Sequence, residues 1–147
     1  MSRIVMKPAL QPELFVYSFP VRVYFENTDA GGVVYHGEYL KFLERARTEW
    51  LRHLGFDHQS LAADHRVVFV VSAVAADFAL AARLDDLLAV SVRLESLGKV
   101  RCIFAQEIRR EDEVLVKAKV TVACVSAEAF KPVEIPEPLR RKMEASV

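Results

Sequence analysis

The alternation of apolar and polar residues along this chain predicts a strand, a long helix and then more strands. Residues 21–26 alternate between an apolar and a polar side, as expected for a half-buried strand. From about Gly37, apolar residues recur at intervals of three and four, which is typical of an amphipathic helix. Gly55 stands where a left-handed cap would end it. Because only one face of this helix is apolar, we expect it to pack against a sheet.

The rest of the chain supplies the strands of that sheet. Residues 67–78 are almost entirely apolar, which indicates a central strand covered on both faces. Three more strands, separated by short polar turns, are predicted at residues 88–97, 100–110 and 114–126. Strands joined by short turns run antiparallel. We therefore predict an α+β fold in which the long helix lies across one face of an antiparallel sheet.

The two ends of the chain depart from this pattern. Residues 1–18 contain Pro8 and Pro12 and are predicted to form an irregular N-terminal arm. Three prolines between residues 132 and 138 exclude another central strand, whereas a short helix from about Glu137 is compatible with the pattern. Because no repeat or linker interrupts the chain, residues 1–147 are interpreted as a single domain.

Composition and charge exclude several classes of protein. The 20 basic and 20 acidic residues give a formal net charge of zero, so neither nucleic acid nor an anionic membrane is an expected partner. The longest apolar stretch, residues 67–76, is too short to span a bilayer. The N-terminus does not resemble a signal peptide, which predicts a cytoplasmic protein. Cys102 and Cys124 are isolated in apolar segments and are predicted to be buried, inert thiols.

The candidate catalytic residues lie between the first predicted strand and the helix. Asp29 precedes the pair Gly31 and Gly32, and His36 follows them at the helix start. A helix N-terminus presents unpaired N–H groups and partial positive charge, which can stabilise the oxyanion that forms when a carbonyl is attacked. A nearby carboxylate can attack that carbonyl or deprotonate a water. The pattern predicts an acyl-transfer or hydrolysis site, or alternatively an Asx turn at Asp29 without catalysis.

No motif for a metal or a cofactor accompanies this site. The other histidines have no partners at metal-ligand spacing, and the chain contains no P-loop, dinucleotide fingerprint or G-x-S-x-G motif. We therefore predict that the protein needs neither a metal nor a cofactor.

One long stretch strongly resembles the hotdog-fold acyl-CoA thioesterases: residues 21–51, V-R-V-Y-F-E-N-T-D-A-G-G-V-V-Y-H-G-E-Y-L-K-F-L-E-R-A-R-T-E-W-L. It is most similar to their branch associated with the Tol–Pal cell-envelope system, related to 4-hydroxybenzoyl-CoA thioesterase. A-R-L-D-D at residues 82–86 and V-x-V-A-C-V at residues 120–125 extend the similarity. The resemblance implies a five-stranded antiparallel sheet wrapped around one long helix. It also implies homodimers or homotetramers with active sites at the subunit interface.

The resemblance further implies an activity: hydrolysis of an acyl-CoA thioester, or of one carried by acyl carrier protein, to a carboxylic acid and a free thiol. Asp29 matches the family's catalytic carboxylate, and its role as nucleophile or general base stays open. Gly32 and the backbone N–H of His36 match the turn and helix start that polarise the carbonyl. The His36 side chain is a further candidate for orienting substrate or water.

Substrate-binding residues are expected on both sides of this centre. Tyr35 and Tyr39 are predicted to line the acyl pocket or its wall. Three basic residues are candidates for binding the CoA phosphates: Lys99, Arg101 and Lys131. The preferred acyl group stays open, because the resemblance extends to thioesterases for short aliphatic, aromatic and long-chain substrates.

The chain departs from the family pattern at two places, and two other functions remain as alternatives. Asn27 stands where close relatives often carry a second acid, which predicts less like-charge repulsion on Asp29. Gly37-Glu38 replaces a more usual Ala/Pro-Asn/Ser pair, which affects the acyl pocket or the helix start. A hotdog hydratase would need a histidine five residues after the aspartate, an arrangement that is missing here. The other alternative is a non-catalytic acyl-thioester-binding or scaffolding module of the cell envelope.

Overall fold

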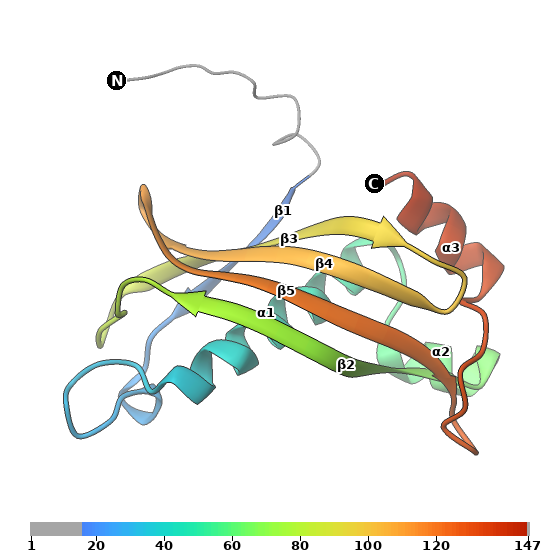
Figure 1. Cartoon of the computed structure of the whole chain (residues 1–147), viewed down its shortest axis with the longest axis horizontal. Coiled ribbons are helices and arrows are strands. Elements are labelled where there is room, and N and C mark those ends of the chain that lie inside the picture. Colours follow the sequence, from blue (N-terminus) through green and yellow to red (C-terminus); the bar gives the residue numbers. More distant parts are fainter. Residues whose placement is uncertain (1–15, 147) are drawn as a thin grey trace.

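Five antiparallel strands form one sheet, and the long helix α1 lies across one of its faces (Figure 1). This computed structural model describes residues 16–146. The strands, in sheet order, are β1 (Tyr17–Arg22), β3 (Leu87–Leu97), β4 (Arg101–Arg110), β5 (Glu113–Ser126) and β2 (Val67–Phe78). The helices are α1 (His36–His53), α2 (His58–His65) and α3 (Glu137–Glu144), with a 3-10 turn η2 (Phe25–Asn27) before α1. The predicted α+β fold, with one long helix against a five-stranded antiparallel sheet, is confirmed.

The predicted amphipathic pattern of α1 matches the face that it buries. Its buried residues are Tyr39, Phe42, Leu43, Ala46, Trp50 and Leu51, which recur at helical spacing and face the sheet. The Trp50 ring meets the Phe104 ring of β4 edge to face, with centroids 5.1 Å apart. After the helix ends, Gly55 has a φ of +96°, so the predicted left-handed residue is confirmed.

One buried polar side chain links α1 to the sheet. Gln106 of β4 is almost fully buried, and its amide nitrogen donates to the main-chain oxygens of Leu43 and Ser91 at 3.2 and 3.3 Å. Its side-chain oxygen accepts a hydrogen bond from Nη1 of Arg47 at 2.9 Å. Because a buried polar group is costly when it is left unpaired, these contacts favour one position of α1 along the sheet.

The prediction for the first strand is wrong in its position. The strand β1 pairs with β3 over Tyr17–Arg22, so Tyr17 and Ser18 belong to the sheet and not to an N-terminal arm; residues 1–15 of that arm lie outside the described residues. Beyond Arg22, the chain stays extended through Val23 and Tyr24, and Val23 exchanges hydrogen bonds with Asp85 and Asp86. It then turns at η2, so the alternation over 21–26 reflects burial of Val23 and not a continuous strand.

Two further elements differ from the predictions. The strand β2 has the predicted bounds, but it lies at an edge of the sheet and is not a central strand. Much of it is exposed in a single chain, including Val71 at 49% and Val74 at 43%. The helix α2 was not predicted, because Leu61 is its single buried residue and so it has no apolar periodicity. Its start is nevertheless capped by Asp57, whose side chain accepts the Ser60 N–H at 2.7 Å. The short C-terminal helix from Glu137 is present as α3.

Candidate active site

Asp29 is the first residue of a tight turn that precedes α1. Its main-chain N–H donates to the Val33 oxygen at 2.9 Å, and its main-chain oxygen accepts the Gly32 N–H at 3.0 Å. Gly32 has a φ of +84°, a conformation that a residue with a Cβ rarely adopts. One carboxylate oxygen of Asp29, Oδ1, accepts the Gly31 N–H at 2.8 Å. The predicted Asx turn is therefore present, and it holds the exposed carboxylate in one orientation.

The first turn of α1 presents two backbone donors with no acceptor in the described part of the chain. The N–H of Tyr35 donates to the main-chain oxygen of Asn27 at 3.1 Å, and the N–H of Glu38 donates to the oxygen of Tyr35 at 2.8 Å. Between them, the N–H groups of His36 and Gly37 have no acceptor among residues 16–146. Because they lie at the positive end of an 18-residue helix, they can bind a carbonyl oxygen or an oxyanion.

Aromatic rings cover this helix start. The rings of Tyr35 and His36 are 4.5 Å apart, and the His36 ring meets Phe78 of β2 at 6.2 Å. A Cβ added to Gly37 would lie 2.8 Å from Cε2 of Tyr35, which is closer than atoms can approach. Glycine at position 37 therefore allows the Tyr35 ring to lie against the helix. Tyr35 is 51% exposed, so its ring is accessible to a substrate.

Tyr39 lies deeper and supports the turn. It is buried, and its hydroxyl oxygen accepts the Ala82 N–H at 2.9 Å. The main-chain oxygen of Ala82 also accepts the N–H of Val34, at 2.9 Å, which fixes the end of the turn that carries Asp29. The centroid of the Tyr39 ring lies 5.7 Å from that of the Phe78 ring. Tyr39 thus supports the turn from the core side. Its contribution to an acyl-pocket wall stays a prediction.

The two positions at which this chain departs from the family pattern contact each other. Nδ2 of Asn27 donates to Oε1 of Glu38 at 2.7 Å. The hydrogen bond from Asn27, together with that from Lys41, lowers the pKa of Glu38, so its carboxylate is ionised at neutral pH. Sequence reasoning missed this pair, because the two residues are eleven positions apart and only the path of the turn brings them together.

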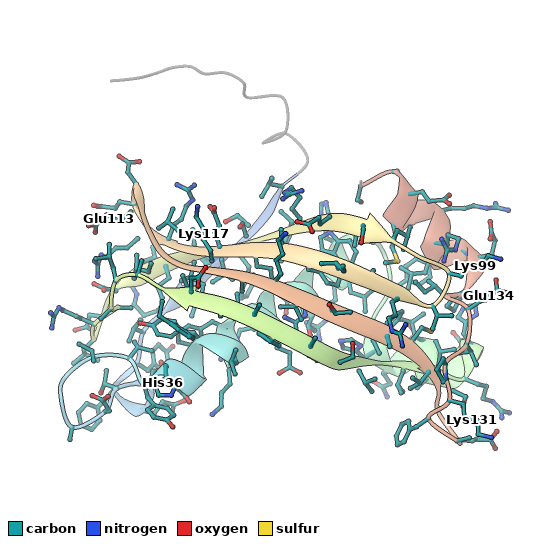
Figure 2. All side chains as sticks on the ribbon, in the orientation of Figure 1. His36, Lys99, Glu113, Lys117, Lys131 and Glu134 are labelled. Carbon is teal, nitrogen blue, oxygen red and sulfur yellow. The ribbon has the colours of Figure 1, made fainter. Side chains whose placement is uncertain are left out.

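The three basic residues predicted to bind CoA phosphates lie far from this centre within one chain. Lys99 and Lys131 are found at one end of the sheet, whereas His36 lies at the other (Figure 2). Lys131 follows β5, where its main-chain oxygen accepts the Ser126 N–H at 2.8 Å; Arg101 begins β4 beside Ala123. All three are exposed. A single chain therefore brings together Asp29, Gly32, Tyr35, His36 and Tyr39, but not the basic residues.

Other kinds of site have little support in the part of the chain that the structure describes. No group of three or more His, Cys, Asp or Glu side chains there could hold a metal ion. None of the described helices is both long and apolar enough to cross a membrane. Cys102 and Cys124 are buried, and burial raises their pKa values to about 12 and about 11. They are therefore protonated and unreactive at neutral pH.

Comparisons with known proteins identify thioesterases as relatives of this chain. A family model described as the thioesterase superfamily matches residues 31–117, which is more than half of the chain. The acyl-CoA thioesterase YbgC of Haemophilus influenzae is 48% identical over 124 residues, covering 84% of this chain and 91% of that protein. The acyl-CoA thioester hydrolase YbgC of Escherichia coli O6:H1 is 45% identical over 123 residues, covering 83% and 91%. The crystal structure of a probable thioesterase from Bartonella henselae has a TM-score of 0.80 and 38% identity, covering 82% of this chain and 99% of that chain.

Proposed function

Because this chain belongs to the thioesterase superfamily, we propose that it hydrolyses an acyl-CoA thioester to a carboxylic acid and free CoA. The observation that carries the proposal is the pair of uncommitted N–H groups at His36 and Gly37, at the start of the helix that follows the Asp29 turn. Such donors stabilise negative charge on a carbonyl oxygen under attack, and a carboxylate beside them supplies the attacking group.

In this mechanism the thioester oxygen accepts hydrogen bonds from the N–H groups of His36 and Gly37. Asp29 either bonds to the carbonyl carbon, expelling the CoA thiolate and leaving a mixed anhydride that water hydrolyses, or removes a proton from the attacking water. The Gly31 N–H holds one carboxylate oxygen, which orients the other for either role. The positioned carboxylate and the amide donors each contribute about two to three powers of ten in rate. The His36 ring is a candidate for orienting substrate or water.

A second copy of the chain would complete the site. The strand β2 is an uncovered edge, and its Phe78 end lies beside His36. If two copies pair antiparallel through β2 about a two-fold axis, the Phe78 end of one copy lies beside the Val67 end of the other. Val67 pairs with Ser126, next to Lys131. The proposed homodimer, alone or as half of a tetramer, would therefore bring the basic end of one chain toward His36 of the other, where the CoA phosphates are expected.

The experiment that tests this function compares wild type with D29N in free-thiol release from short, aromatic and long-chain acyl-CoAs. Asparagine keeps an oxygen that can accept the Gly31 N–H, so the turn, the fold and CoA binding should persist. We expect turnover to fall by at least about 100-fold, as for loss of a positioned base or nucleophile. The panel also ranks the acyl groups.

Two outcomes would contradict the proposal in different ways. Equal turnover by wild type and D29N would make Asp29 a turn residue without a catalytic role. Absence of thiol release from every substrate, by folded wild-type protein that still binds CoA, would favour the non-catalytic acyl-binding module. Incorporation of labelled oxygen from water into the Asp29 carboxylate during a single turnover would identify the nucleophilic route. The cytoplasmic location and the link to the Tol–Pal system stay predictions from the sequence.

A further inference from the structure

Asn27 is a buried residue whose polar groups all have partners. It is 6% exposed. Its main-chain N–H donates to the Tyr24 oxygen at 2.9 Å, and its main-chain oxygen accepts the Tyr35 N–H at 3.1 Å. Its side-chain Oδ1 accepts the Tyr24 N–H at 2.7 Å, and its Nδ2 donates to Oε1 of Glu38 at 2.7 Å. One side chain therefore connects the turn η2 to the first turn of α1.

The polarity of this connection is fixed. A main-chain N–H can only donate, so the Tyr24 N–H requires the oxygen of the Asn27 amide. The amide nitrogen must then face Glu38, and the Glu38 carboxylate can only accept. The second carboxylate oxygen of Glu38 lies 2.9 Å from Nζ of Lys41, which adds a charged partner. An aspartate at position 27 would satisfy Tyr24 but would place a second carboxylate against Glu38, at a cost from like-charge repulsion and lost hydrogen bonding.

These contacts flank the two N–H groups that lack acceptors. Asn27 holds Tyr35 through its main chain and Glu38 through its side chain, and His36 and Gly37 are the two residues between them. Asn27 also lies two residues before Asp29. We propose that Asn27 and Glu38 are positioning residues: their hydrogen-bonded pair holds the N–H groups of His36 and Gly37 in register with the Asp29 carboxylate. The effect on catalysis rests on the proposed function, whereas the brace itself does not.

Reversing the polarity of the pair tests this inference. N27D places two carboxylates together, whereas N27D/E38Q restores one hydrogen bond with donor and acceptor exchanged. We expect N27D to lower kcat by about 10- to 100-fold at pH 8, since small misplacements of catalytic groups have costs of this size, with little change in KM. We expect N27D/E38Q to recover to within about threefold of wild type. E38Q alone should lower kcat only a few-fold, because glutamine still offers an oxygen to Asn27.

The pH profile separates positioning from a general loss of structure. In N27D the two carboxylates should share a proton, so one of their pKa values rises. Its activity relative to wild type should therefore recover as the pH falls from 8 toward about 5, whereas a variant that is merely misfolded would show no such recovery. Thermal melting of all four proteins establishes that they are folded before the rates are compared.

Amide hydrogen exchange measures the brace without using activity. The Tyr35 N–H should exchange about 10-fold faster in N27D than in wild type and should regain protection in N27D/E38Q, because loss of the side-chain contact frees the helix start. The inference would be overturned if N27D at pH 8 had the kcat and the Tyr35 exchange rate of wild type. It would also be overturned if a folded N27D/E38Q recovered neither quantity. If wild type released no thiol while exchange still followed the polarity of the pair, the proposed function would fail and the brace would stand.

Discussion

Gly37 shows how one missing side chain shapes the helix start. A glycine inside a helix is less favourable than alanine by up to about 1 kcal/mol, so its presence in the first turn of α1 has a cost. The contact geometry gives a reason, because a Cβ at this position would approach Cε2 of Tyr35 to 2.8 Å. With glycine, the Tyr35 ring lies over the helix and beside the His36 ring. The position of Tyr35 is therefore tied to residue 37.

We predict that G37A changes acyl selectivity without loss of fold. The half-exposed Tyr35 ring should rotate away from the new methyl group, while the helix gains up to about 1 kcal/mol from alanine. The measurement is the ratio of kcat/KM for an aromatic and a long-chain acyl-CoA, which we expect to change by about three- to tenfold. The control is the same substitution in a Y35A background, where no ring remains to be displaced. A change of equal size in both backgrounds would show that Tyr35 does not transmit the effect.

The local part of the site was predictable from sequence, and its long-range part was not. Asp29, Gly32 and the N–H of His36 follow one another in a single turn, so their proximity depends on eight consecutive residues. By contrast, the hydroxyl of Tyr39 is engaged by Ala82, which is 43 positions away. No residue pattern indicates such a contact. Tyr39 was predicted as part of the acyl pocket, but its buried hydroxyl has a bracing role that only the folded chain defines.

Among the larger elements, the loop between β2 and β3 supports the turn that carries Asp29. Asp86 in this loop accepts hydrogen bonds at 2.8 Å from the Arg83 N–H and from Nη1 of Arg110 on β4. Burial alone would raise the pKa of Asp86, but these hydrogen bonds outweigh burial and lower it. The same loop hydrogen-bonds to the turn that carries Asp29, because the main-chain oxygen of Ala82 accepts the Val34 N–H. The A-R-L-D-D segment is thus a structural connection between the sheet and the site.

We predict that D86A destabilises the protein by about 1–2 kcal/mol at pH 7, the range for losing charged hydrogen bonds of a partly buried group. Because the folded pKa of Asp86 lies below its ordinary value, this stabilisation is fully present above pH 4 and is lost as the pH falls through the folded pKa. Urea unfolding of both proteins should therefore give a difference that shrinks below about pH 4. E113A is the control, since Glu113 is an exposed partner of the same Arg110. A difference that does not change with pH would contradict this assignment.

Element types were predicted more reliably than their surroundings. The periodicity of α1 and the hairpin turns are local features, so the helix and four strands appear close to where the sequence places them. The first strand was misplaced because Val23 is buried by the loop at Asp85 and Asp86, and burial by a loop leaves the same alternation as a strand. The helix α2 was missed because a cap at Asp57 without an apolar face gives little periodic signal.

For the whole molecule, the main question is what covers β2. Its apolar sequence predicts burial on both faces, yet a single chain leaves Val71, Val74 and Phe78 between 43% and 49% exposed. An exposed apolar edge strand invites pairing with another strand. The prediction of a central strand is wrong for one chain, but it would hold for two chains paired through β2. The apolar sequence of β2 thus matches the burial expected in the proposed homodimer, whereas a single chain buries only part of the strand.

We predict that V74K dissociates the proposed homodimer and abolishes turnover while the chain stays folded. Position 74 is half-exposed, so the fold should tolerate a lysine there. In the dimer, however, the two lysines would lie close together across the symmetric edge and repel each other. L87K is the control, because Leu87 is similarly exposed, at 53%, but lies on β3, away from this edge. Sedimentation, circular dichroism and thiol release should show monomeric, folded, inactive V74K and oligomeric, active L87K. If wild type were instead monomeric at the concentrations of the assay and still turned over substrate, one chain would hold a complete site. The basic residues at its far end would then have no part in binding CoA.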